Sequence, residues 1–556
     1  MEARFARRNL RAWALSRGRA FLLMQRAMST ELTSTASNGH AVLPTNGAEI
    51  RNVSPNDLRP LQAVRATPIA SLRDVVLRSR NAQPGWAEMP LAERAAAITR
   101  AAKRMLRDRD EVIALARDEV GKCDAEGIFN EALGPLDAVG AWTKLLKEHL
   151  GPNAVGLNPM AFPKKKASIT LVPRGVIGVI APWNFPVAGL YRSVMPALLS
   201  GNGLVLKPSE RSPRSSAWFV EQIARELPAG LATVVQGDGA VGSALVDAGI
   251  DACVFTGSVK AGNAVRVKCA EKGIPSSVEM GGKDAAIVLA DADLDRTVAG
   301  LTMWALSNAG QACGAIEIVY VDRGVADELV ERLARAWRKL RTGAGEVDVA
   351  PLQNAQQLGV VEAHVKDALA KGASLVCGGA RGPVGLTYLP TLLDRCTHDM
   401  DVVKDETFGP VLAIVRVDGV ADAIHHVNAS RYGLGASIWT RDEDRAKRIA
   451  DKLNVGVVIV NNHAFTGAVP FLPWSGTRET GFGVANSQHA LATFTRPKTF
   501  VIDGVADPDF FWLPYDKSLV ELGNLLADAQ IGKILRAWKI PLLMRERAAK
   551  VREFFR

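Results

Sequence analysis

The stretch that decides the fold is Ala252-Cys253-Val254-Phe255-Thr256-Gly257-Ser258, an apolar run that ends abruptly in small polar residues. A short apolar run closed by Thr-Gly-Ser predicts a buried strand that opens into the first turn of a helix. Backbone N–H groups at a helix N-terminus attract a phosphate group. This stretch therefore predicts a strand–loop–helix unit with a pyrophosphate site at Ser258.

The same alternation continues on both sides of this stretch. Apolar strands are predicted at 204–206, 233–235, 252–255 and 285–289, with helical segments at about 188–200, 214–226, 240–248 and 259–271. A second series has strands near 316–321, 374–377, 411–417, 435–439 and 455–460. Strands that alternate with helices predict parallel sheets covered on both faces. We expect an α/β fold with two doubly wound parallel-sheet domains and a site in the cleft between them.

Length and composition set the protein class. The chain has 556 residues, of which 48% are apolar and 23% charged, a balance typical of folded soluble proteins with more than one core. The net charge is +10, but the first 27 residues hold seven Arg and one Glu, so most of the excess lies there. The rest of the chain has no basic stripe interleaved with aromatic residues, which argues against nucleic-acid binding.

The N-terminal segment has two interpretations. Met1–Ala27 is Arg-rich and nearly free of acids, like a transit peptide, and its apolar core is too short for a secretory signal. Alternatively, translation starts at Met28, which is followed by an ordinary soluble N-terminus. Residues 29 to about 60 are rich in Ser, Thr, Asn and Pro and predict a loose arm.

The cysteines indicate a reducing compartment. None of the six forms a CxxC pair or stands at zinc-ligand spacing from a His, so we expect no structural metal. No apolar run reaches 18 residues, so no transmembrane helix is predicted.

Three groups suited to acyl chemistry lie in separate motifs. Cys313 follows Gly310-Gln311-Ala312, Glu279 lies 34 residues earlier, and Asn184 belongs to Ala181-Pro182-Trp183-Asn184-Phe185-Pro186. A thiol attacks a carbonyl carbon, a side-chain amide donates to the resulting oxyanion, and a carboxylate activates water. The set predicts chemistry through a thioester.

Two further segments concern a nucleotide. Lys207-Pro208-Ser209-Glu210 ends a predicted strand, where Glu210 can accept from a ribose 2′-hydroxyl and would repel a 2′-phosphate. The segment from Gly237 to Gly242 fits GxGxxG, but no acidic residue follows Gly242 at about 20 residues, so it is not expected to be the main phosphate loop.

From about residue 69 to residue 500 the chain resembles the NAD(P)-dependent aldehyde dehydrogenase superfamily. The motifs that carry the resemblance are, in chain order, Pro182-Trp183-Asn184-Phe185-Pro186, Lys207-Pro208-Ser209-Glu210, Phe255-Thr256-Gly257-Ser258, Glu279-Met280-Gly281-Gly282-Lys283, Gly310-Gln311-Ala312-Cys313 and Glu406-Thr407-Phe408-Gly409-Pro410. Their order and spacing together are specific.

The resemblance assigns roles to residues. It implies that Cys313 is the nucleophile, that Glu279 is the general base, and that Asn184 forms the oxyanion hole with the Cys313 N–H. The cofactor contacts that it implies are Ile180, Trp183, Lys207, Glu210, Gly242, Ser258, Met280, Gln357, Glu406 and Phe408. Among these, Lys207 and Glu210 hold the adenosine ribose, Ser258 the pyrophosphate, and Glu406 the nicotinamide ribose.

Three departures from the family pattern concern proton transfer and substrate. Ser193 stands where many hydrolytic members carry Lys, and Val484-Ala485 stand where many carry Arg-Glu after the late Gly-x-Gly. These groups would form a proton relay to Glu279, so water or another path is expected here. The usual Pro-Phe-Gly-Gly-x-Lys is the segment Pro473-Trp474-Ser475-Gly476-Thr477-Arg478.

The pattern and the resemblance together divide the chain into five segments. These are a flexible arm at 1–60, an NAD-binding domain at 61–280 interrupted near 163–174 by part of an oligomerisation hairpin, a catalytic domain at 281–483, an oligomerisation strand at 484–503 and a basic amphipathic helical tail at 504–556. The tail holds nine Lys/Arg and four Asp/Glu from Lys517 onward, with an apolar stripe from Leu519 to Trp538. Such a helix either lies on a membrane surface or docks onto the protein's own body or a sister subunit.

The resulting functional prediction is oxidation of an aldehyde to a carboxylic acid, with NAD as cofactor and NADP as the alternative. We expect a small-molecule aldehyde substrate, a homodimer or homotetramer, and a cytoplasmic location unless the leader directs import or the tail binds a membrane. One rival is a CoA-acylating relative, against which Glu279 argues. The other is a membrane-peripheral scaffold without activity, against which the complete set of Asn184, Glu279 and Cys313 argues.

Overall fold

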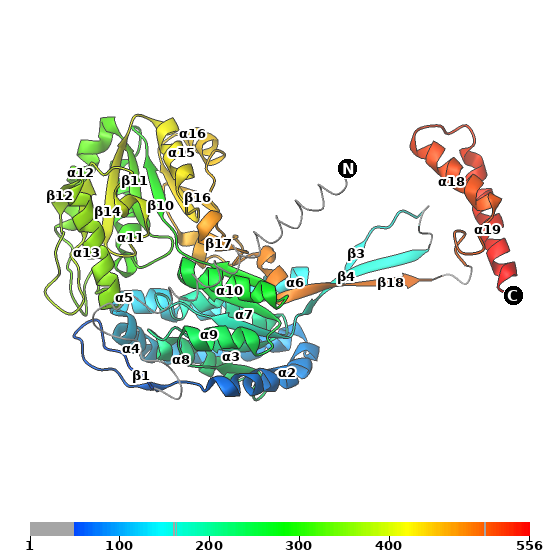
Figure 1. Ribbon diagram of the computed structural model, residues 1–556, viewed down its shortest axis with the longest axis horizontal. Helices are drawn as coiled ribbons and strands as arrows, with labels where there is room; N and C mark the ends of the chain where they lie inside the picture. Colours follow the sequence, from blue (N-terminus) through cyan, green and yellow to red (C-terminus); the bar gives the residue numbers. More distant parts are fainter. Residues whose placement is uncertain (1–48, 160–161, 163, 505–507) are drawn as a thin grey trace, which may run out of the picture. The chain divides into compact units, whose positions relative to one another are not determined.

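The computed structural model describes residues 49–159, 162, 164–504 and 508–556. The predictions for Met1–Ala27 and Met28 lie outside these residues. Two sheets flanked by helices hold most of the described chain (Figure 1).

The first sheet has six strands in the order β17-β9-β8-β5-β6-β7. In that order their bounds are Gly481–Phe482, Ser276–Glu279, Ala252–Thr256, Val176–Ile180, Gly203–Lys207 and Ala232–Val234. All neighbours pair in parallel except the short edge strand β17, which pairs antiparallel with β9. The helices along this part of the chain are α2 (Leu72–Glu88), α3 (Leu91–Arg107), α4 (Arg109–Val120), α6 (Gly134–His149), α7 (Tyr191–Leu199), α8 (Pro213–Ala224), α9 (Gly239–Asp247) and α10 (Val259–Glu271).

Alternate strand residues of this sheet enter different cores. Leu204 and Leu206 of β6 pack with α3, α6, α7 and α8, whereas Val205 packs with α2, α9 and α10. Because both faces are buried, the strand is apolar without polar alternation, which is typical of parallel sheets.

The second sheet has seven strands in the order β12-β13-β14-β11-β10-β15-β16. Their bounds are Ser374–Cys377, Thr391–Asp394, Val411–Val417, Ile316–Asp322, Asp284–Val288, Gly435–Trp439 and Val457–Val460. The associated helices are α11 (Leu294–Leu306), α12 (Arg323–Trp337), α13 (Ala355–Ala370), α14 (Asp401–Lys404), α15 (Val420–Ala429) and α16 (Glu443–Ala450). The edge strand β12 is antiparallel to β13, and the other pairs are parallel.

Two expectations need correction. The strand predicted at 285–289 continues the first series along the chain, but β10 lies between β11 and β15 in the second sheet. The four residues between β9 and β10 pass from one sheet to the other, and alternation alone cannot show such a crossing. Residues 49–60, predicted as part of a loose arm, instead contact the body: β1 (Glu49–Ile50) pairs with β2 (Val64–Arg65), and the Pro55 carbonyl accepts from the Leu386 N–H.

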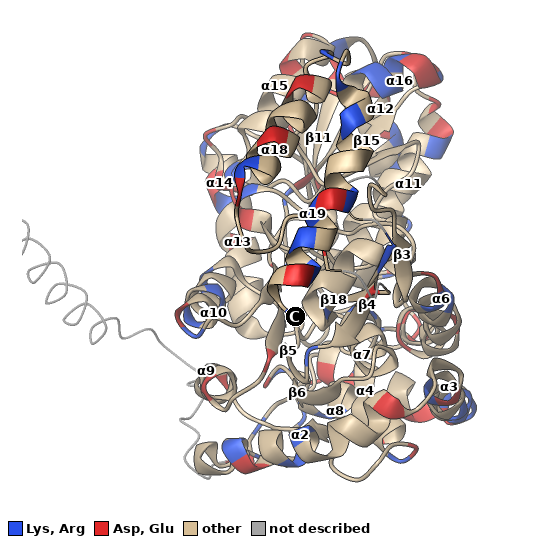
Figure 2. Ribbon diagram, turned by 90° about the vertical axis from the view of Figure 1, so that its right-hand side faces the viewer, with Lys and Arg blue, Asp and Glu red and all other residues tan. Residues whose placement is uncertain are grey.

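A separate three-stranded sheet has the order β18-β4-β3, with bounds Thr495–Asp503, Lys165–Pro173 and Asn153–Val155. β18 pairs antiparallel with β4 over its nine residues and follows the short helix α17 (Leu491–Phe494). Beyond it, α18 (Lys517–Gln530) and α19 (Ile540–Phe554) lie side by side, with charged residues along the C-terminal half of α19 (Figure 2).

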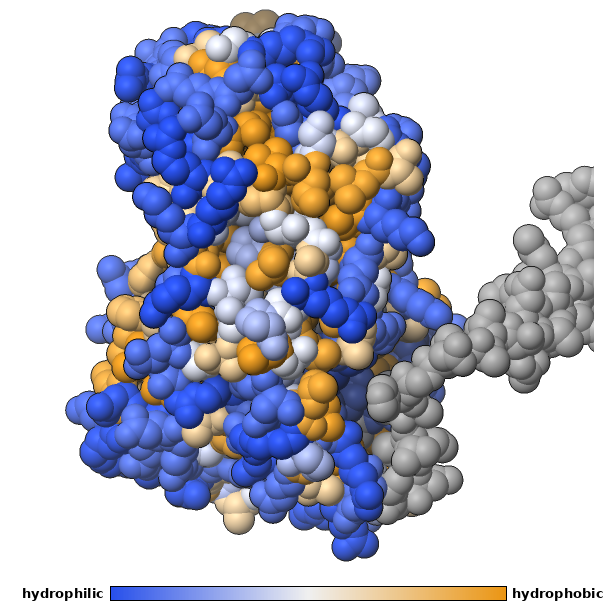
Figure 3. All heavy atoms as spheres, turned by 90° about the vertical axis from the view of Figure 1, so that its left-hand side faces the viewer, coloured by the Kyte–Doolittle hydropathy of each residue, from blue (hydrophilic) through white to orange (hydrophobic). Residues whose placement is uncertain are grey.

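Hydrophobic residues also reach the surface outside the tail. On the face drawn in Figure 3 they gather between hydrophilic upper and lower ends. Within the described ranges, no helix is both long and apolar enough to cross a bilayer. No group of three or more His, Cys, Asp or Glu side chains in the same ranges is arranged to hold a metal ion.

Candidate active site

A strained turn places the candidate nucleophile. Asn308, Ala309 and Gly310 all have positive φ, at 52°, 55° and 72°, just before Cys313. A Cβ at Gly310 would lie 2.1 Å from the Gly409 carbonyl oxygen, so only glycine fits there. The Asn308 amide donates to the Asn184 and Gln311 carbonyls at 3.0 and 3.1 Å. Non-glycine residues persist in this region only when their surroundings fix them, as these hydrogen bonds do.

Cys313 directs its thiol at Glu279. The Sγ atom lies 3.3 Å from Glu279 Oε1, and the geometry is that of a thiol donating to a carboxylate. Burial raises the pKa of the Cys313 thiol well above its ordinary value, and the negative charge of Glu279 raises it further. The resting side chain is therefore a protonated thiol whose proton acceptor is already in place.

Glu279 has two more partners. The Trp474 indole Nε1 donates to its Oε1 at 2.7 Å, and Arg192 Nη1 lies 3.4 Å from its Oε2. The Arg192 guanidinium also sits 5.8 Å from the Trp474 ring centroid. Glu279 ends β9, opposite Gly481 of β17. Its carboxylate is thus held between a thiol, an indole and a guanidinium.

Asn184 lies on a loop that a buried carboxylate holds. Its Nδ2 donates to the Gln311 carbonyl at 3.0 Å, which leaves the second amide hydrogen for another acceptor. Glu131 accepts from the Val187 and Ala188 N–H groups, both at 2.9 Å. Lys122 pairs with Glu131 at 2.9 Å, and both side chains are fully buried. The Lys122–Glu131 pair therefore fixes the backbone that carries Asn184.

A cleft of about 710 Å³ opens in front of Cys313. It brings together the predicted nucleophile, the amide and the predicted cofactor contacts, whichever sheet they come from. These are Ile180, Trp183, Asn184, Lys207, Glu210, Gly242, Ser258, Met280, Cys313, Gln357, Glu406 and Phe408. Glu279 lines a small adjoining cavity, and Arg192 lines both.

The end of the cleft away from Cys313 fits the adenosine and pyrophosphate of a dinucleotide. Lys207 Nζ donates to the Gly237 carbonyl at 2.7 Å and lies 3.4 Å from Glu210 Oε2. Burial lowers the pKa of Lys207, and Glu210 partly offsets this. A Cβ at Gly242 would lie 3.3 Å from the Lys207 side chain, so the bare backbone keeps this part of the cleft open. Ser258 caps α10 by accepting from the Ala261 N–H, and the helix begins at the cleft wall.

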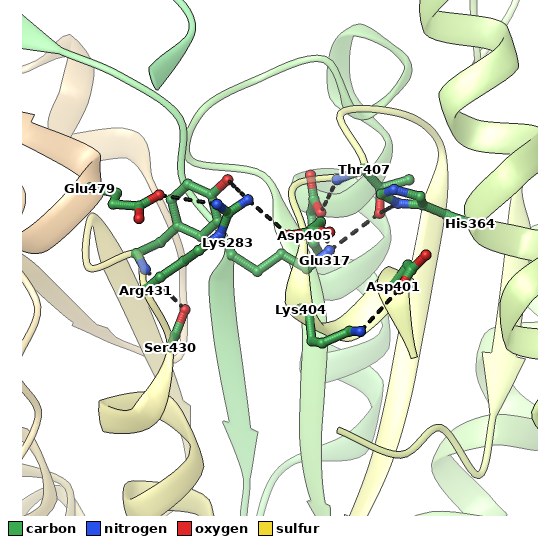
Figure 4. Close-up of polar contacts among 11 residues, drawn as sticks. Lys283, Glu317, His364, Asp401, Lys404, Asp405, Thr407, Ser430, Arg431 and Glu479 are labelled. Carbon is green, nitrogen blue, oxygen red and sulfur yellow. Dashed lines mark hydrogen bonds and ion pairs between the residues drawn. The ribbon is translucent and has the colours of Figure 1, made fainter. Parts of the chain in front are cut away.

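At the near end, Glu406 and Phe408 lie on a loop held by a second buried carboxylate. Glu317 accepts from the Thr407 and Phe408 N–H groups, both at 2.8 Å, and pairs with buried Lys283. Figure 4 shows Lys283, Glu317 and Thr407 together, with His364 Nδ1 3.2 Å from the Thr407 hydroxyl. Glu406 Oε1 accepts from the Gly282 N–H at 2.9 Å. Burial, with a contribution from Glu317, raises the pKa of Glu406 to about 8.

Two predicted contacts have additional roles. The Gln357 amide lines the cleft but also donates to the Thr407 carbonyl at 2.7 Å, so it supports the loop. The Phe408 ring meets the Trp183 ring edge to face, with 5.6 Å between centroids. Both rings therefore form one apolar wall beside Glu406.

Comparison with known proteins identifies the family. The model of the aldehyde dehydrogenase family matches residues 42–500. The chain belongs to this family. It is 35% identical over 475 residues to the 4,4'-diapolycopene aldehyde oxidase of Methylomonas sp, covering 84% of this chain and 89% of that protein.

Solved structures of aldehyde dehydrogenases share the fold. An NADP-dependent glyceraldehyde-3-phosphate dehydrogenase from Bacillus halodurans, solved with NADP, superimposes with a TM-score of 0.77 at 33% identity, over 84% of this chain and 98% of that one. Lactaldehyde dehydrogenase from Escherichia coli gives 0.77 at 29% identity, over 82% and 96%. This aldehyde dehydrogenase is accordingly an NAD(P)-dependent oxidoreductase that acts on aldehydes.

Sequence reasoning missed the groups that support the contact residues of this aldehyde dehydrogenase. The pattern pointed to Ser193 as a lost Lys, but the neighbouring Arg192 carries a positive charge to Glu279. Trp474 belongs to the segment that departs from the usual Pro-Phe-Gly-Gly-x-Lys, and its indole N–H donates to Glu279. Glu131 and Glu317 gave no signal, because each acts on a loop at least 56 residues away along the chain.

Proposed function

We propose that this enzyme oxidises its aldehyde through a covalent intermediate on Cys313. The observation that supports this most directly is the contact of one carboxylate, Glu279, with the thiol at 3.3 Å. Glu279 takes the thiol proton as sulfur adds to the aldehyde carbon, and the oxyanion meets the Asn184 amide and the Cys313 N–H. A donor of this kind typically lowers the barrier by about 3–4 kcal/mol.

The cofactor supplies one kind of chemistry: when bound, its nicotinamide accepts a hydride from the carbon attached to Cys313. The residues suited to hold it are Lys207 and Glu210 at the adenosine ribose, Ser258 at the pyrophosphate and Glu406 at the second ribose. Cys313 is left as a thioester, which Glu279 opens by activating water. General-base assistance of this kind contributes about 10²–10⁴-fold.

Arg192 and Trp474 hold Glu279 in position during these reaction steps. Arginine stays charged at physiological pH, so Arg192 can hold the Glu279 carboxylate in place but cannot carry its proton away. The proton therefore leaves through water, in the absence of the usual Lys at position 193.

We infer a preference for NAD over NADP from Glu210. Its carboxylate stands beside Lys207, where it can accept from a ribose diol but would repel a 2′-phosphate. Comparing kcat/KM for the two cofactors tests this, with Glu210→Gln as the variant that should gain activity with NADP. A wild-type ratio that favours NADP would show that Lys207 or the adjacent Arg211 takes the phosphate.

We also propose a homo-oligomer, either a dimer or a tetramer, in the cytoplasm. β18 is a nine-residue edge strand, and Phe500, Val501 and Ile502 expose their side chains along it. Such an edge invites pairing with another chain. The six cysteines are all free thiols, which fits a reducing compartment. Contact with a membrane through the tail is a separate proposal that depends on other residues.

The decisive assay is a panel of aldehydes with NAD, scored by NADH and by the carboxylic acid formed. Equal amounts of both, without consumption of added CoA, support hydrolysis of a thioester. Formation of acyl-CoA would favour the CoA-acylating alternative. A folded protein that forms no NADH with any aldehyde would favour the scaffold.

A further inference from the structure

The C-terminal tail has a core of its own. Leu522 and Leu525 of α18 pack on Ile540 of α19, with Phe510, Leu526 and Met544 among the partly buried neighbours. Arg547 is fully buried and donates to the carbonyls of Phe510, Trp512 and Pro514. The inner faces of the two helices are therefore covered by the tail itself.

The connection between the helices exposes apolar side chains. Leu535 is 94% exposed, Ile534 70% and Trp538 66%, and Ile531 and Leu542 are exposed beside them. Residues 531–536 are all exposed, and the connection ends in the short helical turn η9 (Ala537–Lys539). Apolar groups concentrated at one exposed end mark a binding surface.

Cations interleave with these apolar residues. Lys533, Arg536, Lys539 and Arg545 fall between Ile531 and Arg545, and no Asp or Glu does. Lys539 lies 3.9 Å from Glu521, but Lys533, Arg536 and Arg545 form no ion pair within the described part of the chain. We call the segment from Ile531 to Arg545 the tail tip.

We propose that the tail tip binds the surface of an anionic lipid bilayer. Its apolar side chains enter the boundary between headgroups and acyl chains, and its cations meet lipid phosphates and carboxylates. Trp538, which carries an N–H on a large apolar ring, suits that boundary. The contact is peripheral, because five exposed apolar side chains on the connection and the first turn of α19 cannot span a membrane.

A second copy of this chain fits the tail tip poorly. A twofold contact brings a patch against itself, so four cations would face four cations. The cores of subunit interfaces are also depleted in charged residues. The β18 edge differs, because it presents an unpaired strand edge together with the exposed side chains of Phe500, Val501 and Ile502. We therefore assign subunit contacts to β18 and lipid to the tail tip.

The test is sedimentation of the full-length enzyme with vesicles of phosphatidylcholine alone or with phosphatidylserine. We expect binding only to the anionic vesicles, lost between about 0.1 M and 1 M salt as the Debye length falls from about 10 to 3 Å. Lys533→Gln/Arg536→Gln/Lys539→Gln and Leu535→Ser/Trp538→Ser should each weaken partitioning about tenfold or more.

Matched controls separate the tail tip from other charges. Lys103→Gln/Arg107→Gln/Lys147→Gln removes the same charge from exposed sites on α3 and α6 and should leave partitioning unchanged. Arg7→Gln/Arg8→Gln/Arg11→Gln measures the contribution of the leader. NADH formation is followed for every variant, so that a failed proposal on the tail is distinguished from a failed proposal on the active site.

Two outcomes would overturn the proposal. One is a failure of the wild-type enzyme to sediment with anionic vesicles at low salt, or binding of both tail-tip variants to these vesicles as strongly as the wild type. The other is a change of mass by light scattering in Leu535→Ser/Trp538→Ser without a change in vesicle binding, which would make the tail tip a subunit interface.

Discussion

Two buried Lys–Glu pairs hold the two loops of the active site, and they differ in what those loops carry. Lys122–Glu131 holds the loop with Asn184, the proposed oxyanion donor, whereas Lys283–Glu317 holds the loop with Glu406 and Phe408. In each pair the carboxylate accepts from two consecutive backbone N–H groups. A buried Lys–Glu pair therefore supports both the loop that carries Asn184 near Cys313 and the loop that carries the predicted cofactor contacts Glu406 and Phe408.

The largest expected effect is the loss of turnover with cofactor binding intact when Cys313 is replaced. Cys313→Ala should reduce aldehyde oxidation to below a few per cent of kcat, because no other thiol faces Glu279. Cofactor binding, measured by fluorescence titration, should be unchanged, since the cofactor contacts come from other residues. Substantial remaining turnover would mean that the nucleophile has been misassigned.

Glu279→Gln tests whether Glu279 acts mainly in hydrolysis of the thioester. Loss of the base should slow thioester hydrolysis by about 10²–10⁴-fold. Formation of the thioester should also slow, because the thiol loses its proton acceptor, but it should slow less, because the amide does not repel the thiolate that forms. Stopped-flow measurement should then show a burst of NADH near one per active site. An equal fall in both steps without a burst would place Glu279 elsewhere in the cycle.

Replacing Glu131 or Glu317 one at a time tests whether the two loops serve different steps. Glu131→Gln should lower kcat by about 10²-fold with little change in KM for the cofactor, because a displaced Asn184 no longer meets the oxyanion. Glu317→Gln should mainly raise KM for the cofactor, about tenfold. Steady-state kinetics with each substrate varied distinguishes the two patterns.

Stability must be controlled in that experiment, because breaking a buried pair typically costs about 3–5 kcal/mol. The double variant Lys122→Met/Glu131→Gln removes the uncompensated charge and should recover stability in thermal melts without recovering kcat. Identical kinetic defects in Glu131→Gln and Glu317→Gln would indicate that both pairs serve folding alone.

A smaller effect is expected at the groups around the base. Arg192→Met and Trp474→Phe should each lower kcat about tenfold, less than the roughly 10²–10⁴-fold expected for loss of the general base itself. Arg192→Lys, which keeps the positive charge near Glu279, should restore most of kcat. Trp304→Phe, which removes an indole donor to Asn462, is the matched control. No difference between Trp474→Phe and this control would argue against positioning by Trp474.

The smallest expected effect is on the pH dependence of the protein's stability, through Glu406. Folding raises the pKa of Glu406 from 4.5 to about 8, so the folded protein holds a proton that the unfolded chain releases above about pH 4.5. Stability is therefore lost as pH rises through this window. Glu406→Gln should show a fall in Tm from pH 6 to pH 9 that is smaller than in the wild type by about 1–3 °C. A parallel fall in both proteins would contradict the raised pKa.

Sequence reasoning identified the residues that face the cleft better than those that stand behind them. Cys313, Asn184, Lys207 and Glu406 lie in motifs with diagnostic neighbours, and the structure places all four around the cleft. Most strands followed from apolar runs, but the sheet to which β10 belongs depended on a crossing that no local pattern records. Glu131 and Glu317 are acidic residues in unremarkable segments, so only long-range geometry reveals them.

The protonated state of Cys313 has a consequence for the life of the enzyme in a cell. Peroxides and alkylating agents attack the thiolate, not the thiol. Burial and Glu279 both keep this sulfur protonated until an aldehyde arrives. The resting enzyme should therefore withstand oxidants and iodoacetamide, and become vulnerable only to electrophiles shaped enough like its substrate to reach the sulfur beside Glu279.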